Sequence, residues 1–443
     1  MQRREFLRVL IHGIAGGALL RDSLTAWAQG RSSPKSAPGT QPTAEISTVS
    51  APGVTPGAVK IGMSAAFTGT AGALGTELYR GAQAYYTEIN ARGGIYGRTI
   101  AVEALNDWYE PVPCITNTIQ LIEKHGVFLL SNYVGTPTLT RALPVIKQYA
   151  DKHLILVGNV SGAQPQREAP YGEHVFNIRA SYRQEMMALV ERFWQLGARK
   201  FGVYYQIDAY GRSGTDGVVR GLAQRGAKIA AEATYARGAK FEDDMSLAVK
   251  TLQEGGVEVV LCTGAYQGCG AFVKSARDLR WDVPISNLSF VGAKPMLHLL
   301  VKHRSTTGRD YTRALVNSHV VPSDDDLSLP AVREYRALMD KHNPALPEFL
   351  RDPEYTPEKY TFIGLEGFIN AKVIVEGLRR AGPNPTRLGF RQALESLRSF
   401  DLGIGSPLTF GAERHQGLDN VYFIHVEKDQ WVPIADWNAV LRA

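Results

Sequence analysis

The sequence predicts an α/β fold of two lobes, each a parallel sheet flanked by helices. From Val59 onward, short apolar runs alternate with amphipathic stretches of helical periodicity. Repeated βα units of this kind form parallel sheets with helices on both faces. The strands are too many for one sheet of ordinary size, so we expect two lobes. A chain of 443 residues can bury cores of this extent.

The predicted elements follow one another in βα order. The apolar runs that predict strands lie at 59–66, 100–105, 126–131, 154–158, 200–206, 228–235 and 257–263. The amphipathic stretches that predict helices lie at 76–90, 112–124, 139–149, 183–196, 214–225, 242–253 and 271–279. The C-terminal third differs. A long helix at 360–380 is followed by "GPNPT", which ends one helix and starts another, and by a β-like segment at 419–437.

The N-terminal segment resembles a twin-arginine (Tat) export signal. Arg3 and Arg4 precede the apolar stretch "VLIHGIAGGALL", and "AWA" at 26–28 supplies a small-x-small cleavage pattern. The apolar stretch is too short to span a bilayer, and no cysteine follows it for a lipid anchor. We therefore expect export with cleavage after Ala28, the alternative being an ordinary amphipathic start. Residues 29–57, rich in Pro, Ser, Thr and Gly, predict a flexible leader.

Composition and motifs argue against several classes of protein. The net charge of +6 is spread along the chain, so we expect no nucleic-acid partner. The sequence has no G-x-S-x-G elbow, no phosphate-binding loop and no H-x-x-x-H pair, so we expect no enzyme site, cofactor or metal. The cysteines Cys114, Cys262 and Cys269 cannot all pair, and buried or free thiols are favoured over a Cys262–Cys269 bridge.

The turn "YVGTPT" at 133–138 follows one predicted strand and leads into a helix. In parallel α/β sheets, ligands bind beyond the carboxyl ends of the strands. Gly135 permits close approach of the backbone, and Pro137 suits the first helical turn. Thr136 and Thr138 offer hydroxyl donors beside a helix N-terminus that favours anions. The alternative is that Thr136 merely caps the helix.

A second turn of the same make-up follows the next strand. "GNVSGAQ" offers Ser161 and Gly162 at a predicted strand end. Two adjacent strand ends with matching donors predict one carboxylate held between them.

Several motifs of the chain together resemble those of a known family. From Val59 to the end the chain is similar to the periplasmic leucine/isoleucine/valine-type solute-binding proteins of ABC importers. The phrases that carry the resemblance are "FTGTAGALGTELYRGAQAYYTEINARGGIYGR", "NDWYEP", "GTPT…LP", "VGNVSGA", "DAYG" and "LEGFINAKVIVEGLRRAG", in the family's order. The resemblance implies a type I periplasmic-binding fold, two Rossmann-like lobes joined by three crossovers. Lobe 1 is then 58–179 plus 320–405, and lobe 2 is 180–319 plus 406–443.

The resemblance also implies roles for particular residues. In the family, hydroxyls and backbone N–H groups of the first lobe hold the ligand's carboxylate. The resemblance assigns this role to Thr136, Thr138 and Ser161. Tyr210 covers the ligand on closure, and Tyr266 is a second candidate. The predicted ligand-binding residues are Thr136, Thr138, Ser161, Gly162, Tyr210, Tyr266, Ser289, Asp208 and Tyr109.

The chain departs from the family pattern at Ser289. Leucine-type members have an acidic residue there, which pairs with the ligand's ammonium. Asp208 and Asp107 are possible substitutes, Glu77 a weaker one, or the ligand has no ammonium. Aromatics in the predicted cleft loops suit a flat or apolar ligand: Trp108, Tyr109, Tyr133, Tyr205, Tyr210 and Tyr266. The family's small first-lobe disulfide is also missing, with Tyr109 and Val134 in its place.

The function predicted from all this is that of an exported solute-binding protein. It captures a small carboxylate-bearing ligand by hinge closure and delivers it to an inner-membrane ABC permease, as a monomer in the periplasm. A ligand sensor of the same fold that regulates a partner protein is the alternative. An exported hydrolase with an unrecognised site is a third, weaker hypothesis.

Overall fold

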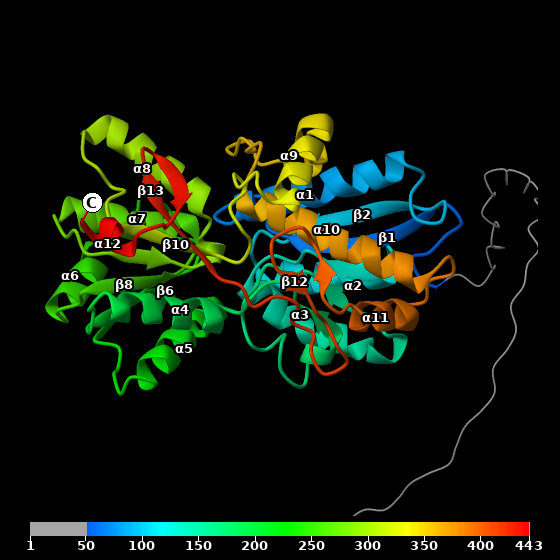
Figure 1. The fold of residues 1–443 in the computed structure, drawn as a ribbon, viewed down its shortest axis with the longest axis horizontal. Coiled ribbons are helices and arrows are strands. Elements are labelled where there is room, and N and C mark those ends of the chain that lie inside the picture. Colours follow the sequence, from blue (N-terminus) through cyan, green and yellow to red (C-terminus); the bar gives the residue numbers. More distant parts are fainter. Residues whose placement is uncertain (1–50, 443) are drawn as a thin grey trace, which may run out of the picture. The chain divides into compact units, whose positions relative to one another are not determined.

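The computed structural model describes residues 51–442. The predicted export signal and most of the predicted leader lie outside the described residues. Within them, the strands form two main sheets and one small two-stranded sheet (Figure 1). Each of the two main sheets contributes turns to the candidate site.

The first sheet is entirely parallel and has the order β2-β1-β3-β4-β5. Its strands are β1 (Ala58–Ala65), β2 (Thr99–Asn106), β3 (Leu129–Ser131), β4 (Leu156–Val157) and β5 (Val175–Phe176). The strand order runs outward from β1 in both directions. Right-handed crossovers therefore place α1 (Gly72–Ala91) on one face of the sheet. They place α2 (Pro111–Glu123) and α3 (Thr136–Gln148) on the other face. The order reverses between β1 and β3, which makes the turn after β3 a preferred ligand position.

The second sheet has the order β14-β13-β10-β9-β8-β6-β7. Its parallel strands are β6 (Phe201–Gln206), β7 (Ala231–Tyr235), β8 (Val259–Thr263), β9 (Ile285–Asn287) and β10 (Leu315–His319). The antiparallel strands β13 (Tyr422–Glu427) and β14 (Gln430–Pro433) complete the β10 edge. The order reverses between β6 and β8, so the turn after β6 is the corresponding ligand position.

Helices cover both faces of the second sheet. By the same handedness, α5 (Ala209–Ala223) lies on one face, where α4 (Tyr182–Gln195) packs beside it. The other face carries α6 (Ser246–Glu254), α7 (Tyr266–Asp278) and α8 (Ala293–Thr307). The chain ends with α12 (Trp437–Arg442).

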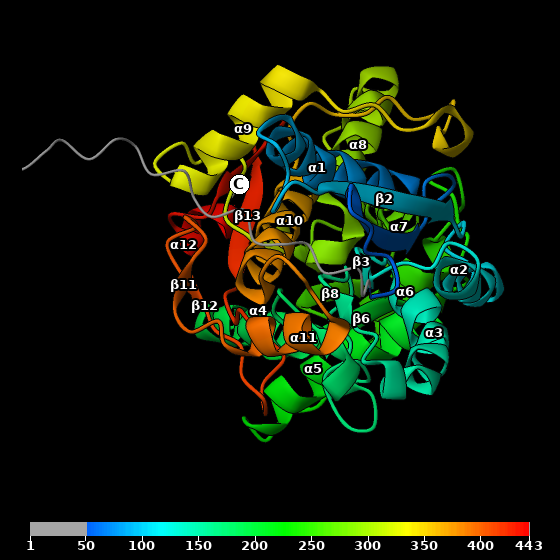
Figure 2. The ribbon, with the colours of Figure 1, turned by 90° about the vertical axis from the view of Figure 1, so that its right-hand side faces the viewer.

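After β10 the chain returns to the first sheet. It forms α9 (Pro330–His342), α10 (Phe362–Ala381) and α11 (Arg387–Glu395), then the small sheet of β11 (Phe400–Asp401) and β12 (Pro407–Leu408). Helices α1 and α10 lie side by side in both views (Figures 1 and 2). They touch backbone to backbone, since a Cβ on Gly81 would lie 1.8 Å from the carbonyl oxygen of Gly364. The close crossing anchors the returning segment to the first lobe.

Two α/β lobes with parallel sheets flanked by helices confirm the predicted fold class. Each predicted strand has a counterpart, and the predicted long helix and helix restart correspond to α10 and α11. The sequence prediction missed β5, β9 and β10, and with them α8 and α9. Strands β9 and β10, "ISN" and "LVNSH", are fully buried yet carry polar residues, so no apolar run marks them. The exact boundaries of the two lobes stay a prediction.

Three further observations concern the described residues. No helix between residues 51 and 442 combines the length and apolar character needed to cross a bilayer. The same part of the chain contains no cluster of three or more His, Cys, Asp or Glu side chains arranged to hold a metal. Cys114, Cys262 and Cys269 are all buried free thiols, as favoured from the sequence.

Candidate ligand-binding site

Two hydroxyls meet where β3 and β4 end. Thr136 is the first residue of α3, and its Oγ1 lies 2.7 Å from Oγ of Ser161, in the turn after β4. Both side chains are buried. The N-cap of α3 is Gly135, at φ +108°, and no side chain caps the helix. The alternative that Thr136 is only a capping residue is therefore wrong, whereas Pro137 occupies the first turn as predicted.

The other two residues predicted in these turns have structural roles in this arrangement. Thr138 Oγ1 donates to the carbonyl oxygens of Val134, at 2.8 Å, and Gly135, at 2.9 Å, so its hydrogen faces its own turn. Gly162 accepts a hydrogen bond from the backbone N–H of Tyr182, and a Cβ there would lie 2.3 Å from that ring. Gly162 thus lets the start of α4 close onto the first lobe.

Two neighbours that the sequence reasoning missed hold the Ser161 turn in place. Gln166 Nε2 donates to Oγ of Ser161 at 2.9 Å and to its carbonyl oxygen at 3.0 Å. The Arg167 guanidinium donates to the carbonyl oxygens of Ser161, Ala163 and Arg179. The only local signal for them is a polar run, "QPQR", directly after the predicted turn.

Aromatic rings from both lobes meet next to the hydroxyl pair. Tyr109, after β2, stacks on Phe290 of the second lobe at 5.8 Å between ring centroids. Tyr210, in the first turn of α5, lies 4.8 Å from Phe290 and 5.0 Å from Tyr182, the first residue of α4. The hydroxyls of Tyr182 and Tyr210 are buried with no hydrogen-bond partner. Burial raises the pKa of Tyr182 to about 12, although Arg179 opposes the rise, so the ring stays a neutral donor.

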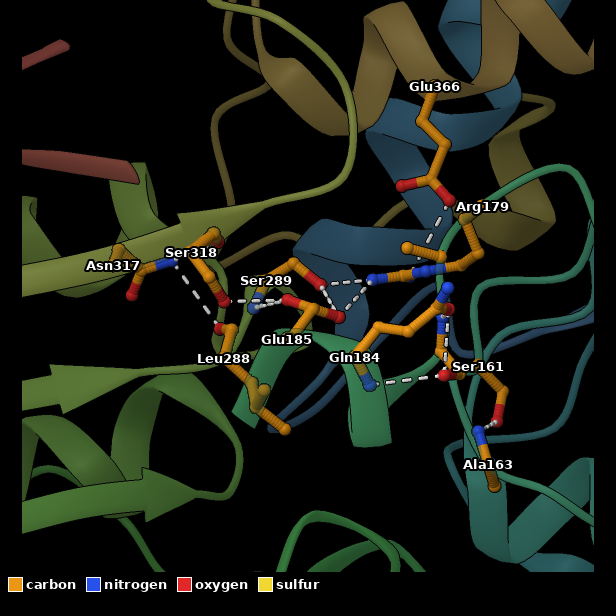
Figure 3. A network of polar contacts seen from close by, with 12 residues as sticks. Ser161, Ala163, Arg179, Gln184, Glu185, Leu288, Ser289, Asn317, Ser318 and Glu366 are labelled. Atoms are coloured by element: carbon orange, nitrogen blue, oxygen red, sulfur yellow. Dashed lines mark hydrogen bonds and ion pairs between the residues drawn. The ribbon is translucent and has the colours of Figure 1, made fainter. Parts of the chain in front are cut away.

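A buried guanidinium lies at the centre of the site. Arg179, in the connection between β5 and α4, pairs through Nη2 with Oε1 of Glu185 at 3.4 Å and through Nη1 with Oε1 of Glu366 at 3.5 Å. It also donates to Oγ of Ser289. Figure 3 shows Arg179 between Glu366, on α10 of the first lobe, and the Glu185–Ser289 pair of the second. Arg179 therefore links charges from both lobes at the connection between them.

Ser289 is not left without a carboxylate. Glu185, in the first turn of α4, accepts from Ser289 N at 3.1 Å and Oγ at 3.0 Å, and from Ser318 Oγ at 2.6 Å. The acid missing from position 289 is thus supplied by another element. Sequence reasoning missed it, and missed Arg179 and Glu366 as well. The available signal was charge within otherwise apolar surroundings, such as Arg179 directly after "VFNI".

The acidic residues proposed as substitutes are engaged elsewhere. Asp208 caps α5 by accepting from the backbone N–H groups of Tyr210 and Gly211, and pairs with Gln206. Asp107 accepts from Ser64 Oγ at 2.8 Å and from Tyr109 N at 3.0 Å, and burial raises its pKa to about 7.

Glu77 is also engaged. It pairs with Arg80 at 2.8 Å and accepts from the Tyr355 hydroxyl at 3.0 Å and from the Glu358 backbone N–H at 2.7 Å. Glu77 therefore binds the 343–361 segment to α1.

The remaining predicted aromatics divide by position. Tyr266 begins α7 and is buried, whereas Trp108 is exposed. Tyr133 lies in a separate core cluster with its hydroxyl 3.1 Å from Oγ1 of Thr118, and Tyr205 donates to Glu232. Of the six predicted aromatics, Tyr109 and Tyr210 are the ones in the ring cluster with Tyr182 and Phe290.

Polar contacts also join elements that belong to the two sheets. Arg237, after β7, pairs with Glu110, before α2, at 2.6 Å. On α8, His298 Nδ1 pairs with Oε1 of Glu358 at 2.8 Å. Lys294, on the same helix, donates to the Tyr360 carbonyl oxygen at 2.7 Å. The aromatic cluster and hydroxyl pair therefore lie in a closed interface between the lobes.

Comparison with known proteins agrees with this arrangement. A family model described as periplasmic binding protein matches residues 58–430. The chain belongs to the periplasmic binding protein family. This confirms the resemblance found in the sequence motifs. The members of this family are solute-binding proteins that act outside the cytoplasm, and they are not enzymes. This periplasmic binding protein therefore has a solute-binding role and an extracytoplasmic location.

Individual relatives of this periplasmic binding protein are distant. An amino acid binding protein of Pseudomonas aeruginosa is 25% identical over 237 residues, 50% of this chain and 57% of that protein. Leu/Ile/Val-binding protein homolog 3 of Brucella melitensis is 22% identical over 350 residues, 79% of this chain and 86% of that protein. The chain thus spans little more than half the length of the first relative and most of the second. A solved structure of a possible leucine/isoleucine/valine-binding protein from Rhodopirellula baltica SH 1 is 28% identical, with a TM-score of 0.77 over 87% of this chain and 98% of that one.

Proposed function

We propose that this protein captures a small carboxylate-bearing ligand, an amino acid or a related aromatic or aliphatic acid, and delivers it to an ABC permease in the inner membrane. The ligand class rests on one observation, the buried Thr136–Ser161 hydroxyl pair at the N-terminus of α3. Unpaired N–H groups and the helix dipole favour an anion at such a position. The role in transport and the periplasmic location rest on the family and its relatives. In this proposal the protein is a monomer whose signal is removed near Ala28.

The proposed mechanism is hinge closure. The first lobe offers the hydroxyl pair. The second lobe offers Phe290, which stacks on Tyr109 of the first lobe, and Tyr210, which packs against Phe290. A ligand that contacts both sides binds the closed form more tightly than the open form, and shifts the population by that difference in affinity. The permease would then recognise the closed form.

Calorimetry on the purified protein tests the ligand class, with a panel of amino acids and aromatic and aliphatic acids. Replacing both Thr136 and Ser161 with Ala leaves a buried carboxylate without its donors. We expect a loss of about 2 kcal/mol in binding free energy, roughly 30-fold in Kd. The matched control is Thr118→Ala, which also removes a buried hydroxyl of the first lobe, one that donates to Cys114 O at 2.7 Å. That variant should keep its affinity.

Two results would contradict the proposal. A folded protein that binds nothing in the panel would remove the carboxylate ligand class. Unchanged affinity in the double variant, with the ligand bound normally by the parent protein, would remove Thr136 and Ser161 from the site.

A further inference from the structure

We propose that the ligand carries no ammonium group: it is a carboxylic acid with a flat or apolar body, not an α-amino acid. This inference rests on the proposed function and narrows its ligand class by excluding amino acids. It thus sets the protein apart from relatives named for binding amino acids or Leu/Ile/Val. It is carried by the way in which the buried acids of the site are already paired.

Glu185 has no lone pair to offer a ligand. Its Oε1 receives Ser289 Oγ at 3.0 Å and Arg179 Nη2 at 3.4 Å. Its Oε2 receives Ser289 N at 3.1 Å and Ser318 Oγ at 2.6 Å. A carboxylate oxygen accepts about two hydrogen bonds, and each oxygen of this buried side chain already has two donors from the protein, of which the Arg179 contact is the longest.

Arg179 occupies the place that a ligand ammonium would need. Its guanidinium contacts Glu185 with one nitrogen and Glu366 with another, so one cation already serves both acids (Figure 3). An ammonium close to either carboxylate would lie within a few ångströms of this guanidinium. Like charges repel strongly in a site shielded from water, and a buried ammonium without a free anion is costly.

Glu366 retains one unpaired oxygen, Oε2. Its Oε1 pairs with Nη1 of Arg179 at 3.5 Å, and burial raises the pKa of this residue although Arg179 opposes the rise. An ammonium at Oε2 would lie close to the guanidinium that already pairs with the same carboxyl group, and the two cations would repel. Glu366 therefore does not supply the missing anion.

The groups that remain free are suited to an oxygen acceptor and a flat body. The unpaired atoms include Nε of Arg179, a donor only, and the hydroxyls of Tyr182 and Tyr210. The neighbouring rings of Tyr109 and Phe290 offer apolar faces. Unpaired buried donors with aromatic rings beside them suit a carboxylic acid that carries no amino group.

Matched ligand pairs test this on the wild-type protein. Calorimetry at neutral pH would compare 3-phenylpropanoate with phenylalanine, and 4-methylpentanoate with leucine, so that each pair differs by the ammonium alone. We expect the acid to bind at least about 100-fold more tightly. An amino acid that binds as tightly as its acid, or more tightly, overturns the inference and leaves the proposed function intact. If neither acids nor amino acids bind, the proposed function itself fails.

A variant gives a second, independent reading. Arg179→Met removes the cation that pairs with Glu185 and Glu366, so a ligand ammonium near these acids no longer meets a competing buried cation. We expect the preference for the acid over the matching amino acid to fall by at least tenfold, while Arg179→Lys, which keeps the charge, retains it. An unchanged preference in a folded Arg179→Met variant contradicts the inference, and the wild-type comparison decides it if that variant does not fold.

Discussion

Replacing Arg179 with Met would test whether the buried charge network joins the two lobes as described. The guanidinium is 1% exposed and is shared by two carboxylates that are themselves buried, Glu185 and Glu366. Removing one partner of a buried ion pair costs about 3–5 kcal/mol, because it leaves uncompensated buried charge. Methionine keeps most of the apolar stem, so packing changes little. We expect a loss of about this size in the free energy of unfolding at pH 8.

The loss should depend on pH in a defined direction. Burial raises the pKa of Glu366 even with Arg179 present, and removing Arg179 removes the opposing effect. A carboxyl group with a raised pKa in the folded state stabilises the protein below its unfolded pKa, about 4.3, and that stability is lost as the pH rises through the folded value. The deficit of the variant should therefore be smaller at pH 5 than at pH 8.

Urea unfolding at both pH values, followed by circular dichroism, measures this. The matched control is Arg277→Met. Arg277 is equally buried, but its guanidinium donates to the backbone carbonyls of Trp281, Val283 and Arg313. That variant should also lose stability, but its deficit should not increase between pH 5 and pH 8 as it does for Arg179→Met. A deficit below about 1 kcal/mol for Arg179→Met, or one that does not grow with pH, would refute the reasoning.

Two further predictions concern the turns and the interface. Gly135 has φ +108°, and Gly135→Ala puts a Cβ 2.5 Å from the Tyr109 ring, so we expect a loss of about 1–3 kcal/mol in the free energy of unfolding, measured in urea. The control is Gly197→Ala. Gly197 also has a positive φ, +98°, but it lies in open space, so this variant lacks the clash and should lose less stability. Equal costs would contradict the close approach. The ion pair with Glu358 raises the pKa of His298, so the pair stabilises the closed form at low pH and is lost as the pH rises through that raised value. Because the imidazole is largely exposed, the affinity for the ligand, measured by calorimetry, should fall by at most about twofold from pH 6 to pH 8. The affinity of the His298→Gln variant should not change over this range. An identical slope in the variant would exclude His298 as its source.

The fold class and part of the site could be predicted from the sequence. Alternating apolar runs and amphipathic stretches are local patterns, and they determined the βα order and the division into two lobes. Because the carboxyl ends of neighbouring parallel strands meet at one edge, two similar turns predicted a common position for Thr136 and Ser161, and these hydroxyls do meet. The strands β9 and β10 were missed because they contain buried polar side chains, such as Asn287 and Ser318, and therefore have no apolar run.

The charges of the site were decided by the tertiary structure alone. Arg179 lies in a connection, Glu185 begins α4, and Glu366 comes from α10 after the chain has returned to the first lobe. No local periodicity brings these positions together. Whether a buried acid is free to bind a ligand or already paired depends on neighbours distant in sequence. The sequence therefore predicted an anion site beside "GTPT", and the fold decided that the nearby acids Glu185 and Glu366 are already paired with Arg179.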